Sequence, residues 1–152
     1  NRQLTKPKRN AFVAGGFIFA KAELFQQIPW DENIYFYGEE ITFALRAWTH
    51  GWDCYTPHLC SIFHYYGRGD EAKHASDNKK WHEIDKQSKR RVLHIMGTEI
   101  VDDVEIEPCY QLGKIRDLAA YQRFSGVDFK ALSITDAASN GVVNLAYNTV
   151  PI

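Results

Sequence analysis

Residues 36–53, FYGEEITFALRAWTHGWD, contain the clearest periodic pattern in the chain. Apolar side chains recur there at positions i, i+3, i+4 and i+7, namely Ile41, Ala44, Leu45 and Trp48. This spacing places them on one face of an α-helix. We therefore predict a helix that begins after Gly38 and ends at Gly51, because glycine is favoured just beyond a helix C-terminus.

Two acids, Glu39 and Glu40, open this helix directly after Tyr35, Phe36 and Tyr37. Carboxylates in a first helical turn interact favourably with the helix dipole, so helix-end electrostatics alone accounts for the pair. The aromatic residues favour a second interpretation, a ligand-facing loop, because carboxylates beside rings are common in sugar-binding sites. Under that interpretation the two acids are candidate catalytic residues.

Upstream, residues 12–20 alternate apolar residues around Gly15 and Gly16, which predicts a buried strand with a backbone kink. Glycine inside a strand is destabilising. The pair therefore indicates either a β-bulge or a floor on which a ligand ring rests. Residues 22–28 predict a short helix, and residues 34–37 a strand or an ordered loop.

Downstream, the pattern predicts strands at 52–56 and 60–66, a long helix at 77–96 and a last short helix at 115–124. Residues 99–107 combine alternating apolar residues with five acids and predict a capping segment or an edge strand. Short strands mixed with helices indicate an α/β fold class.

His64 lies among aromatic residues in the predicted strand 60–66. It is either a neutral core histidine or a metal ligand, and the second role requires carboxylates that converge on the imidazole. His82 and Glu83 resemble the start of a zinc-protease motif, but Lys86 stands where the second histidine is needed. The sequence therefore argues against that class of zinc site.

The amino-acid composition limits which binding partners and which cellular compartment we expect for the protein. The net charge of −1 gives no overall field that would attract nucleic acid. No stretch approaches the ~20 apolar residues that a membrane span requires. The three cysteines lack disulfide or metal-ligand spacing, so we expect buried thiols in a reducing compartment and a cytoplasmic location.

The ends of the chain differ from its middle. Residues 1–11 are basic and are expected to form a solvated linker or tail, residues 12–130 form the folded part, and residues 131–152 form a second tail. Because the chain starts without Met and soon enters a hydrophobic run, it is expected to be part of a longer protein.

Taken in order, these motifs resemble the second half of a GT-A glycosyltransferase. They are most similar to the Skp1-type polypeptide (hydroxyproline) N-acetylglucosaminyltransferases, and more distantly to the mucin-type polypeptide GalNAc transferases. The resemblance rests on FVAGGF at 12–17, FYGEEI at 36–41, RAWTHGWD at 46–53, FHY at 63–65 and RFSGVDF at 123–129. Relative to the mucin-type family, Glu40 replaces an amide and an acid is missing at Thr42.

The resemblance implies the C-terminal part of a Rossmann-like domain with a mixed sheet. The N-terminal nucleotide-binding half, which ends in an Asp-x-Asp motif, is absent, so residues 1–152 alone are expected to be inactive. The implied reaction transfers a sugar, with GlcNAc expected, from a UDP-sugar to a hydroxyl acceptor on a protein or glycan. A non-catalytic carbohydrate- or protein-binding module with the same fold is the alternative.

The resemblance also implies roles for residues. Gly15 and Gly16 would form the floor beside the donor sugar, with Tyr37 and Gly38 close to the substrate. Glu39 and Glu40 would hydrogen-bond sugar hydroxyls or position the acceptor. His64 would bind Mn²⁺ or Mg²⁺ together with ligands from the N-terminal half. Arg46 and Trp48 would anchor and pack their helix.

Overall fold

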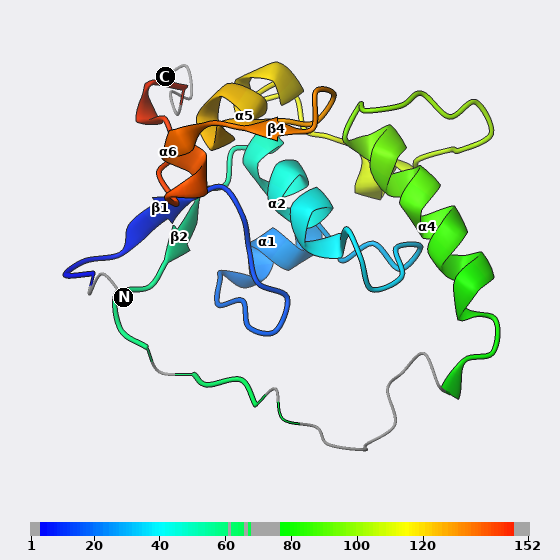
Figure 1. Cartoon of the computed structure of the whole chain (residues 1–152), viewed down its shortest axis with the longest axis horizontal. Helices are drawn as coiled ribbons and strands as arrows, with labels where there is room; N and C mark the ends of the chain where they lie inside the picture. Colours follow the sequence, from blue (N-terminus) through cyan, green and yellow to red (C-terminus); the bar gives the residue numbers. More distant parts are fainter. Residues whose placement is uncertain (1–3, 61, 66, 68–76, 148–152) are drawn as a thin grey trace.

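The computed structural model describes residues 4–60, 62–65, 67 and 77–147. Its helices and strands are short except for α2 and α4, and they surround α2 (Figure 1). In chain order the elements are β1 (Lys8–Asn10), α1 (Ala22–Gln27), α2 (Glu39–Thr49), β2 (Cys54–Thr56), α4 (Trp81–Ile95), the 3₁₀ turn η1 (Pro108–Tyr110), α5 (Leu118–Ser125), β3 (Val127–Asp128), β4 (Ser133–Ile134), α6 (Asp136–Ser139) and η2 (Leu145–Tyr147).

The described strands form two antiparallel pairs, β1 with β2 and β3 with β4. Asn10 pairs with Cys54, and Val127 with Ile134. The α/β class predicted from the sequence is confirmed for this small mixed domain. A Rossmann-like mixed sheet stays a prediction, because the described strands assemble only into these two-stranded pairs.

Helix α2 is the centre of the core, as its periodicity predicted. Its residues from Thr42 to Thr49 are all buried. On one side Trp48 packs against Tyr121 and Phe124 of α5, with ring centroids 5.5 Å away in both cases. On the other side Phe43 belongs to a second apolar cluster with α1. Figure 1 shows α2 between α5 and α1, so one helix joins both clusters.

Among the described helices, α2, α4, α5 and α6 are each followed by a glycine with a left-handed φ. Gly51 follows α2 with φ of +94°, and Gly126 follows α5 with φ of +72°. Asp117 begins α5, where its side chain accepts a hydrogen bond of 2.6 Å from the N–H of Ala120. These caps confirm the predicted helix after Gly38, and place the last predicted helix at 118–125.

Two predicted strands are wrong, and so is the edge-strand alternative for residues 99–107. Residues 12–20 have no strand but a turn at Gly15–Gly16, in which the N–H of Phe17 donates to the carbonyl of Ala14. The described residues of 60–66 and the whole of 99–107 also lack strand structure. Apolar alternation indicates that a segment can pair, but none of these segments pairs with a strand among the described residues.

Both expected tails contain ordered structure. Arg9 of β1 forms an ion pair with Asp53 and lies over the Tyr55 ring, 5.2 Å from its centroid. Toward the other end, β4, α6 and η2 all follow residue 131, and the N–H of Asn144 donates to the carbonyl of Phe124. Described parts of both segments therefore pack on the folded body.

The described cysteines are free thiols. Cys54 is half-buried, and burial raises the pKa of its thiol to about 11. Cys60 and Cys109 are exposed, so the expectation of buried thiols is wrong for these two. Among the described residues, no helix has both the length and the apolar character that a membrane crossing requires.

Candidate functional site

The glycine pair and the acid pair meet in space. The backbone N–H of Gly15 donates a hydrogen bond of 2.5 Å to Oε1 of Glu40. Gly15 lies in an exposed turn, and Glu40 is an exposed residue in the first turn of α2. Two motifs that are 25 residues apart thus contribute to one surface, with the second oxygen of Glu40 left for other partners.

The two glycines of that turn differ in the space around them, although the backbone conformation requires glycine at neither position. Gly15 and Gly16 both lack the left-handed φ that favours glycine. A Cβ on Gly16 would meet no atom within 4 Å, and one on Gly15 would lie 3.3 Å from Oε1 of Glu40. The β-bulge interpretation is excluded, because no strand passes here. The ligand-floor interpretation stays a prediction, and the open space lies at Gly16.

Gly38 differs, because the fold explains it. Its φ is +98°, and a Cβ there would lie 2.4 Å from Cγ2 of Val92 on α4. Just before it, Phe36 has φ of +62°, an unfavourable value for a bulky side chain that costs roughly 1–3 kcal/mol. Tyr37 is exposed beside it, with its ring edge-on to that of Phe36. The loop before the acids is therefore held in a strained conformation.

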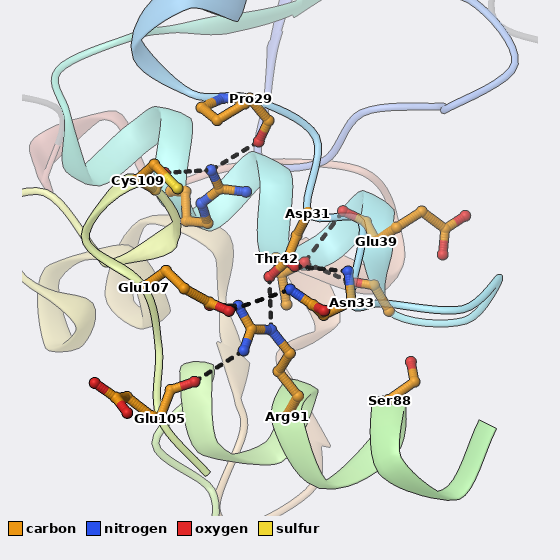
Figure 2. A network of polar contacts seen from close by, with 12 residues as sticks. Pro29, Asp31, Asn33, Glu39, Thr42, Ser88, Arg91, Glu105, Glu107 and Cys109 are labelled. Atoms are coloured by element: carbon orange, nitrogen blue, oxygen red, sulfur yellow. Dashed lines mark hydrogen bonds and ion pairs between the residues drawn. The ribbon is translucent and has the colours of Figure 1, made fainter. Parts of the chain in front are cut away.

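Helix α4 holds this loop and the residues before it through two polar contacts. The buried hydroxyl of Ser88 accepts a hydrogen bond of 2.9 Å from the N–H of Tyr35. Arg91 donates from Nε to Oδ2 of Asp31 at 2.9 Å, and both side chains are buried. Figure 2 shows the Glu39 carboxylate pointing away from these contacts. The network therefore fixes the loop and leaves the acid to face outward.

A second set of contacts extends the network to residues 105–110. The other nitrogens of Arg91 donate to the carbonyl of Glu105 and to the carboxylate of Glu107 (Figure 2). Arg46 of α2 is fully buried, as an anchoring role implies, and its Nη2 donates to the carbonyls of Pro29 and Cys109. The sequence interpretation missed Arg91, and the acidic run at 99–107 was the available signal.

Comparison of the sequence with known protein families identifies the family of this chain. A model of the glycosyltransferase (GlcNAc) family matches residues 1–131, which is most of the chain. The chain belongs to this GlcNAc glycosyltransferase family. No curated protein and no solved structure matches it. The glycosyltransferase prediction is confirmed at this level, whereas the similarity to the Skp1-type and mucin-type families stays a prediction.

In this GlcNAc glycosyltransferase family member, the roles of Glu39 and Glu40 stay a prediction, and the two acids differ in their electrostatic surroundings. Burial raises the pKa of the half-buried Glu39 carboxyl, and the negative charge of Glu40 raises it further. Glu40 is the acid that binds the N–H of Gly15, whereas Glu39 is the first residue of α2 after the strained loop. The two carboxylates therefore occupy different surroundings although they are adjacent in sequence.

The predicted metal ligand, His64, belongs to a different segment of the chain. His64 is exposed, in a segment without regular structure rather than in a strand. In the described part of the chain, no group of three or more His, Cys, Asp or Glu side chains could hold a metal ion. One imidazole does not satisfy Mn²⁺ or Mg²⁺, which prefer several oxygens. The described residues alone therefore do not fit a metal centre.

Two hollows of about 500 and 450 Å³ lie along α4. The first is lined by His94, Ile95, Val104, Glu105, Ile106, Tyr110, Gln111 and Leu112. The second is lined by Glu32, Asn33, Ile84, Gln87, Arg90, Arg91, Asp103, Val104, Glu105 and Glu107. Their linings contain neither the glycine pair nor the acid pair, so the candidate site is argued from the Gly15–Glu40 contact.

Proposed function

We propose that the protein transfers GlcNAc from UDP-GlcNAc to a hydroxyl group on a protein or glycan acceptor. Membership of the GlcNAc glycosyltransferase family supports the reaction class. The hydrogen bond between Gly15 and Glu40 carries the assignment of the site, because it joins an open glycine turn to a carboxylate. The surrounding aromatic residues supply the apolar surface that a sugar ring needs.

The proposed chemistry is a one-step, front-face substitution at the anomeric carbon of the sugar. The acceptor oxygen forms a bond to the anomeric carbon while the bond from that carbon to the diphosphate oxygen breaks. The electron pair of the broken bond stays on UDP, and the acceptor proton passes to the leaving phosphate oxygen. Attack from the face that UDP leaves retains the configuration, and no enzyme nucleophile is required.

The carboxylates orient the sugar in this proposal. One oxygen of Glu40 is bound by the N–H of Gly15, so its second oxygen has a defined direction from which to accept a sugar hydroxyl. Glu39 contributes a second acceptor beside the strained loop. Holding the anomeric carbon within bonding reach of the acceptor oxygen, on the face that UDP leaves, converts binding energy into rate. A bound divalent cation would neutralise charge on the departing diphosphate, and dependence on one is a separate proposal.

Glu40→Gln tests this assignment, because it keeps the size of the side chain and removes its charge. We expect the rate of GlcNAc transfer to fall by about 100-fold, since a misoriented sugar reacts slowly. Transfer from UDP-GlcNAc is measured on the protein that contains this chain, with the exposed Glu99→Gln as the matched control.

Two results would contradict the proposal. Wild-type transfer rates in Glu40→Gln would remove Glu40 from the site. A wild-type protein that binds GlcNAc but releases neither UDP nor product would instead identify the non-catalytic binding module.

A further inference from the structure

Trp30 is a large aromatic residue at the edge of the candidate site. Its side chain is 38% exposed. Its Cζ2 atom lies 3.5 Å from the position that a Cβ of Gly15 would occupy. The same turn residue therefore lies beside both the indole of Trp30 and the carboxylate of Glu40.

The indole is held in place rather than loosely exposed. Its ring centroid lies 4.8 Å from that of Phe43, which is 1% exposed in the core. Both chain neighbours of Trp30 are anchored, since the carbonyl of Pro29 accepts from Arg46 and the carboxylate of Asp31 accepts from Arg91. A rigid aromatic surface loses little conformational freedom when a ligand binds it.

The chemistry around Gly15 selects the kind of ligand. An indole presents an apolar surface, and that of Trp30 is partly exposed. The neighbouring carboxylate of Glu40 accepts hydrogen bonds from hydroxyl groups and repels a phosphate. A pyranose ring offers C–H groups on its face and hydroxyls around its edge, which suits both neighbours. A diphosphate in the same place would be repelled by the negative charge of the Glu40 carboxylate.

We propose that Trp30 is a specificity-determining residue that packs against the GlcNAc ring of the donor beside Glu40. This inference rests on the proposed function and names the side chain that recognises the sugar. Gly15 has no side chain at the point where a Cβ would separate the indole from the carboxylate. The sugar then lies with its apolar face on Trp30 and a hydroxyl on Glu40.

The test uses Trp30→Ala and Trp30→Phe in the protein that contains this chain. We expect Trp30→Ala to raise KM for UDP-GlcNAc by about tenfold, with the inhibition constant of UDP unchanged. Trp30→Phe keeps an aromatic surface and should recover most of the loss. Phe25→Ala is the matched control, because Phe25 is 40% exposed and stacks on the same Phe43 at 6.1 Å.

A binding measurement separates this inference from the proposed function. The chain has four tryptophans, and the indole N–H resonance of Trp30 is the one that Trp30→Phe removes. We expect it to shift when methyl N-acetylglucosaminide is added. A fixed resonance in a protein that transfers GlcNAc would overturn the inference alone. A shifting resonance without transfer would overturn the function alone. Equal loss of UDP and UDP-GlcNAc binding in Trp30→Ala would also overturn the inference.

Discussion

At the scale of single residues, the glycines near the acid pair divide into two kinds. Gly38 has a left-handed φ and faces Val92, so the folded chain itself requires a residue without Cβ. Gly16 has an ordinary φ and open space around its Cα. A glycine that the fold does not need, next to a carboxylate that the turn binds, is a candidate for contact with a ligand.

Alanine at these two positions should therefore act oppositely. Gly38→Ala should lower the free energy of unfolding by roughly 1–3 kcal/mol, because alanine is strained there and meets Val92. Gly16→Ala should leave it unchanged or raise it by about 0.4–1 kcal/mol, because the unfolded chain loses freedom. Urea unfolding measures both.

The Gly16→Ala variant also tests whether the glycine turn forms a floor beneath the donor sugar. Gly16→Ala should weaken UDP-GlcNAc binding in a protein whose stability is intact, since the new methyl group occupies the open space. Unchanged KM for UDP-GlcNAc in that variant would show that no ligand approaches Gly16, and would leave Gly15 as the only glycine of the floor.

At the scale of elements, the contact between α4 and the loop before α2 determines how the acids are presented. Asp31 is buried and depends on Arg91 for its charge partner. Ser88 satisfies the N–H of Tyr35 within the strained part of the loop. Removing such a partner leaves a buried polar group without compensation, which costs far more than the net contribution of the contact.

Two adjacent arginines of α4 provide a matched comparison. Arg91→Leu should destabilise the protein by about 3 kcal/mol, because Asp31 stays buried with a charge that has lost its closest partner. Arg90→Leu breaks only an exposed pair with Asp103 and should change stability by at most about 1 kcal/mol. Similar unfolding midpoints for the two variants would contradict a structural role for the buried pair.

The helices and strands also show which elements can be predicted from sequence patterns alone. The helix at 39–49 follows from its own period, because i, i+3, i+4 spacing is a property of one segment. The predicted strand at 12–20 failed, because a strand requires an edge supplied by another segment. Strand β1 was missed for the same reason: its residues Lys8–Asn10 are polar, and only their pairing with β2 makes them a strand.

At the scale of the whole molecule, the candidate site depends on contacts between distant segments. The glycine and acid pairs could be predicted as candidates from composition and order, but the hydrogen bond from Gly15 to Glu40 could not. Trp30 was missed because a lone aromatic residue before a buried Asp31 has no pattern that marks it as surface-exposed. Its position follows from Phe43, Arg46 and Arg91 together.

The proposed dependence on a cation belongs to this scale, because the described residues supply no complete set of ligands. If the imidazole of His64 is one ligand, the other ligands would be oxygens supplied by the UDP diphosphate and by residues outside the described part of the chain. Chelation by EDTA should then stop GlcNAc transfer, and Mn²⁺ should restore it. His64→Ala should raise the Mn²⁺ concentration that gives half-maximal transfer by at least about tenfold.

His58→Ala is the control for that variant, because His58 is also exposed and lies only six positions earlier in the chain. It should respond to Mn²⁺ like the wild type. Equal Mn²⁺ requirements in the two variants would remove His64 from the metal site, while full transfer in EDTA would remove the cation from the reaction. A selective effect of His64→Ala would place an exposed imidazole at the departing diphosphate, next to a sugar held by Glu40.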